Sequence, residues 1–298
     1  RPPRTTEPTH HRKRTMNLTI GRKLRRAIRN RLNRKASDMP STIVIWAGRS
    51  ALDGVPIMVV VSNITRRSEN VKTGDMVQVA IMRQDMSPQA AWLAGQDGAV
   101  CPEACAHRSK QRGGDGTCYV NKARLESTWK AAMRYLKRYG ALMADGSYQI
   151  NPSHLPARLF EGADIRLGME GDPSAVPLYV WRWLLDGAKK HTGYTANWRD
   201  LGPEWAALFM ASATNPFTAR KAELSGWRVF AGSNSDAMDA DYEAMGMQAC
   251  AADSHGLRCD QCFKCDGTER GSKRPNQFVK FHGAVAAKVR RDVNKVAA

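Results

Sequence analysis

Apolar runs that alternate with helical segments occupy the chain from about residue 100 onward, and this alternation constrains the fold most strongly. The candidate strands are Ile165–Gly168, His191–Thr195, Leu208–Ser212, Trp227–Ala231 and Phe278–Phe281. Helical patterns lie between several of them, at Asn121–Arg138 and after Pro177. Strands that alternate with helices build a parallel sheet. We therefore expect an α/β fold in which residues 99–290 form a complete or partial β/α barrel of the TIM type.

The preceding part of the chain has a different pattern. Three strand-like runs, Thr42–Trp46, Val55–Val61 and Met76–Met82, are separated by turn residues rich in Gly and Asp. Short strands with turns between them favour antiparallel pairing. The sequence thus predicts an N-terminal antiparallel β layer over residues 39–98.

Basic residues gather at the N-terminus. The chain has 46 Lys and Arg against 28 Asp and Glu, a net charge of +18, and residues 1–35 alone hold 13 bases against one acid. We expect residues 1–38 to be a basic, partly disordered tail that contacts DNA or RNA. A membrane-surface helix, or a leader that precedes a true start at Met16, is the alternative.

The hydropathy pattern limits where the protein can work. No run approaches the roughly 20 apolar residues that a membrane-spanning helix needs. No apolar region follows the basic stretch, as it would in a secretory signal. We expect a protein without a membrane span that works in the cytoplasm.

All seven cysteines lie in two short windows, which we call the first and second cysteine sets. The first set is Cys101, Cys105 and Cys118, and the second is Cys250, Cys259, Cys262 and Cys265. Clustered thiols in a chain without a signal peptide more often bind metal than form disulfides. The second set can hold one zinc ion or one iron–sulfur cluster, and His282 is an alternative fourth ligand. Three thiolates can hold a [4Fe-4S] cluster and leave its fourth iron open, an arrangement for chemistry. The first set could instead recruit a cysteine of the second set, or form a zinc loop.

Several segments, read in order, resemble a family of small, largely uncharacterised bacteriophage proteins. They include LDGVPIMVVVSN, KTGDMVQVAIM, GGDGTCYVN, IRLGMEGDPSAVP, GYTANWR, MASATNP and CDQCFKCDG, and the resemblance covers roughly Ile45 to Gly283. It implies a phage source and no particular reaction.

A more distant resemblance is to radical S-adenosylmethionine enzymes. These have a three-cysteine cluster loop, an aromatic residue beside the last cysteine, and a Gly-Gly-Glu-Pro element after the second barrel strand. Here the first set would hold the cluster, and Glu170, Gly171, Asp172 and Pro173 would form the element that binds S-adenosylmethionine. The spacing of the cysteines is x3 then x12 where the family has x3 then x2, and Asp172 replaces the family's Glu.

This resemblance implies reductive cleavage of S-adenosylmethionine by an enzyme that modifies a nucleotide or nucleic acid. Asp172 and Glu170 are the candidate catalytic carboxylates, and the second set would hold an auxiliary cluster or a zinc ion. Polar residues at later strand ends would contact cofactor or substrate, or would make ordinary strand-end contacts: Tyr194, Arg199, Ser212 and Asn215.

Two other functions fit the same residues. Queuine-type and phage deazaguanine transglycosylases are similar β/α barrels, in which Cys259, Cys262, Cys265 and His282 would hold zinc and Asp172 would be the nucleophile. A non-enzymatic phage protein with two zinc modules and a basic arm would bind nucleic acid through its phosphates.

Overall fold

The computed structural model describes Leu24, Arg26, Ser68 and residues 40–65, 72–269 and 274–281. Most of the predicted tail therefore lies outside the described residues. Leu24, which the sequence places on the apolar side of that tail, is helical and buried, whereas Arg26 is exposed.

The first of two five-stranded sheets has the strand order β1-β2-β3-β6-β7. These strands are β1 Thr42–Arg49, β2 Pro56–Ser62, β3 Val77–Arg83, β6 Asp164–Glu170 and β7 Lys190–Thr192. β1, β2 and β3 pair antiparallel, which confirms the predicted N-terminal β layer. β3 also pairs parallel with β6, so this layer and the first parallel strands share one sheet.

The second sheet is wholly parallel and has the order β11-β12-β10-β9-β8. Its strands are β8 Tyr194–Thr195, β9 Met210–Ala213, β10 Val229–Ser233, β11 Gln248–Ala249 and β12 Gln277–Lys280. Gly193 alone separates β7 from β8, so one stretch of chain leaves the first sheet and enters the second. A Cβ atom at Gly193 would lie 2.9 Å from the Phe209 ring, so only glycine permits this close approach. The fold is mixed α/β, as predicted.

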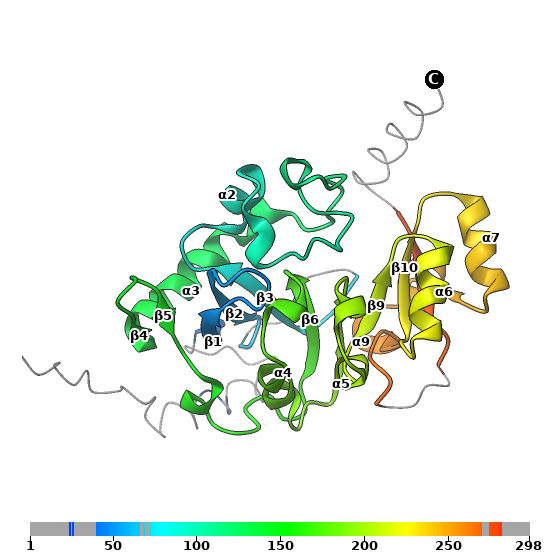
Figure 1. The fold of residues 1–298 in the computed structure, drawn as a ribbon. Coiled ribbons are helices and arrows are strands. Elements are labelled where there is room, and N and C mark those ends of the chain that lie inside the picture. Colours follow the sequence, from blue (N-terminus) through cyan, green and yellow to red (C-terminus); the bar gives the residue numbers. More distant parts are fainter. Residues whose placement is uncertain are drawn as a thin grey trace, which may run out of the picture.

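Helices cover the strands, and most follow the predicted alternation (Figure 1). They are α2 Pro88–Leu93, α3 Glu126–Tyr139, α4 Leu178–Leu185, α5 Pro203–Ala206, α6 Pro216–Leu224, α7 Asp236–Ala244, α8 Ala251–Ser254 and α9 Cys259–Cys262. The predicted helix Asn121–Arg138 begins as a 3-10 turn, Lys122–Leu125, and continues as α3. A two-stranded hairpin of β4 Ala141–Leu142 and β5 Tyr148–Gln149 follows α3, and the sequence analysis did not predict it.

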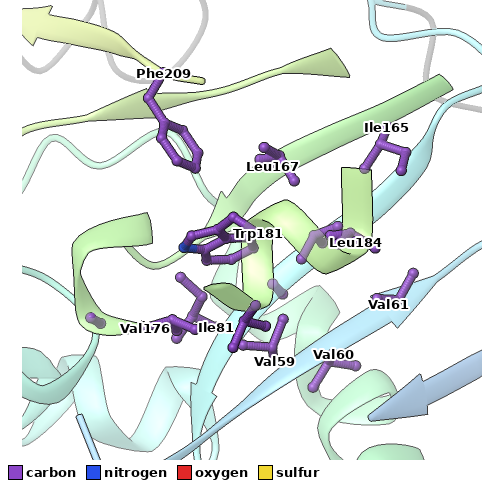
Figure 2. Packing of buried hydrophobic residues seen from close by; sticks show 14 of the residues in the cluster. Val59, Val60, Val61, Ile81, Ile165, Leu167, Val176, Trp181, Leu184 and Phe209 are labelled. Atoms are coloured by element: carbon purple, nitrogen blue, oxygen red, sulfur yellow. The ribbon is translucent and has the colours of Figure 1, made fainter. Parts of the chain in front are cut away.

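The core between α4 and the first sheet holds the end of β6 in place. Trp181 of α4 is fully buried and packs edge to face on Phe209, with ring centroids 5.9 Å apart, among apolar side chains of β2, β3 and β6 (Figure 2). Its indole Nε1 donates a hydrogen bond to the Pro173 carbonyl at 3.1 Å. Because a buried indole N–H needs a partner, this bond fixes the turn that follows β6 relative to the core.

Candidate functional site: two cysteine sets at opposite ends of the parallel strands

β6 runs two residues beyond the predicted strand end and includes Glu170, so only Gly171, Asp172 and Pro173 follow the strand. This turn contacts the first cysteine set. Gly171 has a φ of 80°, and a Cβ atom there would lie 2.7 Å from Cβ of Ile81, so only glycine fits. The Asp172 amide donates to the Val100 carbonyl at 2.7 Å, and Val100 directly precedes Cys101. This backbone bond joins the turn to the start of the first cysteine loop.

Asp172 is buried, and its carboxylate links the ends of two strands. Oδ1 accepts hydrogen bonds from the Ser174 amide at 2.9 Å and the Thr195 hydroxyl at 2.7 Å, and Oδ2 accepts one from the Ala196 amide at 2.6 Å. Burial raises the pKa of Asp172, although these hydrogen bonds act in the opposite direction. The side chain lies at the predicted strand end and holds β6 to the end of β8.

Glu170 forms a buried ion pair with Lys122, a residue that the sequence analysis did not single out. Lys122 Nζ lies 2.9 and 3.0 Å from the two carboxylate oxygens and 3.5 Å from Sγ of Cys118. It also lies 4.6 Å from the ring centroid of Trp92. Burial raises the pKa of Glu170, although the positive charge of Lys122 acts to lower it. Burial acts to lower the pKa of Lys122, but the attraction of its ammonium group to Glu170 and Cys118 is larger, so that pKa is raised.

The first cysteine loop folds back on itself, which explains how the x12 spacing brings the third thiol to the other two. The Asp115 amide donates to the Ala106 carbonyl at 2.9 Å, and the Gly116 amide donates to the Arg108 carbonyl at 3.0 Å. These two bonds close the loop between Cys105 and Cys118. The longer spacing therefore still returns the chain to the same place.

The three thiols of the first set influence one another. Cys101 donates a hydrogen bond to Cys105, which lowers the pKa of Cys105 to about 7 although burial acts to raise it. Burial raises the pKa of Cys118, and the charge of Cys105 adds to that rise. Cys105 is therefore the thiol of this set that ionises most readily.

Basic and aromatic side chains brace this loop. Arg112 donates to the Cys101 carbonyl at 2.9 Å, and Arg108 donates to the Cys105 carbonyl at 2.8 Å. His107 lies 2.7 Å from the Thr117 hydroxyl, and its ring meets Phe281, directly after β12, edge to face with centroids 5.5 Å apart. Tyr119 lies against the same Phe281 ring. The loop thus extends from the carboxyl end of β6 to that of β12.

The second cysteine set gathers around Cys265, which is half-buried. Burial raises the pKa of Cys265 to about 12, and the charges of Cys250, Cys259 and Cys262 act in the same direction. The Tyr194 hydroxyl forms a hydrogen bond with Cys265 that partly offsets this rise. The pKa values of Cys250 and Cys259 are also raised, first by burial and then by neighbouring thiol charges. A bound cation would balance the charge of such a donor set.

This second loop is attached at the amino ends of the strands. Arg228, which directly precedes β10, donates to the Lys264 carbonyl at 2.7 Å and to the Asp266 carboxylate at 2.9 Å. The Cys259 amide donates to the Lys72 carbonyl, ahead of β3. A Cβ atom at Gly267 would lie 2.2 Å from the Ala207 carbonyl, after α5. Figure 1 shows α9 close to α5 and on the other side of the strands from the loop that follows α2.

The remaining predicted residues are not brought together. Tyr194 lies with the second cysteine set and stacks on Phe230 at 4.3 Å, whereas its neighbour Thr195 contacts Asp172. Asn215 caps α6 by accepting from the Thr218 amide, and Ser212 lies half-buried in β9. Arg199 stacks on the adjacent Trp198 ring. His282 lies outside the described residues.

Both cysteine sets suit a metal or cluster in donor chemistry, because each has soft thiol ligands in a loop with several anchors. In the part of the chain that the structure describes, no three Cys, His, Asp or Glu side chains already form a group placed to hold a metal ion. Side chains of either set would have to turn to bind one. Within the same described part, no helix combines the length and the apolar character needed to cross a lipid bilayer.

Comparison with models of protein families, with curated proteins and with solved structures finds no match. The functional argument therefore depends on the residues and geometry of this chain.

Proposed function

We propose that this chain is an iron–sulfur enzyme of the radical S-adenosylmethionine type that modifies a nucleotide or nucleic acid. One observation carries the proposal: Cys101, Cys105 and Cys118 lie near enough to influence one another's ionisation at the carboxyl end of β6, beside the turn of Glu170 to Pro173. Parallel α/β folds place their chemistry at the carboxyl ends of the strands. The second set, at the amino ends, would hold an auxiliary cluster or a zinc ion that stabilises the fold.

The protein residues around the first set have separable tasks in this proposal. When bound, a [4Fe-4S] cluster with one iron free of cysteine would supply the electron for cleavage of a carbon–sulfur bond in S-adenosylmethionine. Lys122 pairs with Glu170 and contacts Cys118, so its positive charge offsets the negative charges of the site. Asp172 keeps the ends of β6 and β8 together, and Gly171 lets the backbone turn between them.

The wider setting is part of the same proposal. The parallel strands would belong to a complete or partial β/α barrel, and the protein would come from a bacteriophage and work in the host cytoplasm. Its basic N-terminal tail would contact DNA or RNA.

Metal analysis of protein purified without oxygen tests the chemistry. We expect a brown protein that contains iron and acid-labile sulfide. Replacing Cys101, Cys105 and Cys118 together by Ala should remove part of the iron, and the matched variant Cys259→Ala, Cys262→Ala, Cys265→Ala should remove a different part or all of the zinc. A colourless protein that contains only zinc would refute the proposal and favour a transglycosylase or a zinc-containing nucleic-acid-binding protein.

Binding of S-adenosylmethionine tests the turn after β6. Reduced, iron-replete protein should bind it, and the triple alanine variant of the first set should not. Asn215→Ala is a suitable control because Asn215 caps α6. Absence of binding to iron-replete protein would overturn the role proposed for Glu170 to Pro173.

A further inference from the structure

The outward side of α3 concentrates positive charge. Residues 122–138 contain six basic residues and one acid, a net charge of +5, whereas the whole of residues 36–298 has a net charge of only +6. Nearly all the surplus charge outside the tail therefore lies in one short segment. Lys122 is buried in its pair with Glu170, which leaves the other bases of the segment for the surface.

The geometry of α3 aligns these bases. We define the α3 basic face as Lys130, Arg134, Lys137 and Arg138, all of them exposed. Lys130, Arg134 and Arg138 follow one another at steps of four residues, so they lie about 6 Å apart along the helix axis and span about 12 Å. Such a row can meet several successive phosphates of one nucleic-acid strand.

Few acids balance this face. Lys130 lies 3.3 Å from the Glu126 carboxylate in an exposed pair, and Arg138 lies over the Tyr139 ring at 5.3 Å. Among the residues that the structure describes, no ion pair joins Arg134, Lys137 or Arg138 to an acid. A face with one acid among its neighbours attracts a polyanion.

The opposite side of α3 determines which polyanion fits. Ala132, Tyr135 and Leu136 are buried, and α3 packs on β1 with Trp129 bonded to the Arg83 carbonyl at 2.8 Å. A helix that binds a membrane surface inserts its apolar side into the lipid. The apolar side of α3 is already used in the core, so only its charge is available to a partner.

We propose that the α3 basic face binds the phosphate backbone of a nucleic acid. The inference is independent of the cysteine chemistry, since it depends on α3 alone. It also fits the position of the site: α3 begins eight residues after Cys118, and the turn before it carries Lys122, which contacts that thiol. A strand held along α3 would pass beside the first cysteine loop.

The test compares two variants of the full chain that each lose four positive charges. One replaces the four residues of the α3 basic face by Gln, and the matched control replaces exposed bases elsewhere in the fold by Gln: Arg182, Lys189, Arg220 and Lys221. Fluorescence anisotropy with a labelled 20-base-pair DNA duplex and a labelled 20-nucleotide RNA, at several salt concentrations, gives the slope of log affinity against log salt. The removal of four phosphate contacts should reduce that slope by about 3 to 4.

The expected result is this reduction for the α3 variant with at least one probe, and a reduction below about 1 for the control. The double variant Arg134→Gln, Arg138→Gln should lose about half as much, and thermal melting should show all variants folded because the changed side chains are exposed. Equal reductions in both four-residue variants, or none in the α3 variant, would overturn the proposal. Leu142 and Met143 are exposed beyond α3, so binding to vesicles that contain phosphatidylserine is measured as well. If the α3 variant lost binding to vesicles and kept binding to both nucleic acids, the proposal would also be overturned.

Discussion

Replacement of Lys122 by Met should destabilise the protein strongly, because it removes one partner of a buried ion pair. The side chains of Lys122 and Glu170 are only 10% and 5% exposed, and Nζ bonds both carboxylate oxygens. Loss of the lysine leaves the Glu170 carboxyl buried without a partner. Breaking a buried pair in this way costs about 3 to 5 kcal/mol, which for a chain of this size lowers the Tm by about 5 to 8 °C.

Thermal melting followed by circular dichroism measures this effect, and two further variants separate its cause. The double variant Lys122→Met, Glu170→Met removes both charges and should regain most of the loss, since an apolar pair of similar volume is often as stable as a buried ion pair. Lys130→Met removes the exposed pair with Glu126 and should change the free energy of unfolding by less than about 1 kcal/mol. If Lys122→Met melted within about 2 °C of the unmodified protein, or if the double variant were less stable than the single one, the reasoning would be refuted.

Three other changes have definite expected outcomes. Arg228→Met should lower the free energy of unfolding by about 1.5 to 3 kcal/mol, because it removes a buried hydrogen bond to the Asp266 carboxylate, which keeps its ion pair with Arg274. The exposed Arg220→Met should cost less than about 1 kcal/mol, and equal effects of the two changes in thermal melts would contradict this. Tyr242→Phe should cost about 1 kcal/mol, seen in urea unfolding, since the buried hydroxyl donates to a backbone carbonyl at 3.1 Å. Burial lowers the pKa of His154 below 6.5, so the neutral ring contributes stability above pH 6.5, and this stability declines as the pH falls from that value toward the folded-state pKa. His154→Gln should flatten the decline in thermal melts between about pH 7 and 5, and an unchanged profile would count against this prediction.

The strands were predictable because apolar runs with β-branched residues leave few alternatives. The predicted strand Val55–Val61 corresponds to β2, and Ile165–Gly168 lies within β6. Each observed strand begins within two residues of its predicted start. The split of His191–Thr195 into β7 and β8 was not predictable, since it depends on the approach of Phe209 to Gly193 in the folded core. A contact between residues distant in the sequence leaves no local pattern.

The turn after β6 shows the same division between local and distant information. Its place at a strand end followed from an apolar run and a Gly-Asp-Pro sequence. The partners of its side chains did not follow: the hydroxyl of Thr195 reaches Asp172, and Lys122 reaches Glu170 across 48 positions of sequence. A lysine in a helical pattern is normally exposed, so nothing in its neighbours marked Lys122 as buried.

The two cysteine sets, alike in composition, differ in what their loops connect. The first loop contacts the carboxyl ends of β6 and β12, the ends of the strands at which parallel α/β folds place their ligands. The second loop binds Lys72, ahead of β3 in the first sheet, and Arg228, ahead of β10 in the second sheet. It therefore links the two sheets at the amino ends of their strands, opposite the Glu-Gly-Asp-Pro turn. A structural metal site stabilises a fold in a similar way, because it joins separate segments of the chain. Since the spacing of cysteines does not record the direction of a strand, only the fold separates the set that we propose for chemistry from the set that we propose for holding the sheets together.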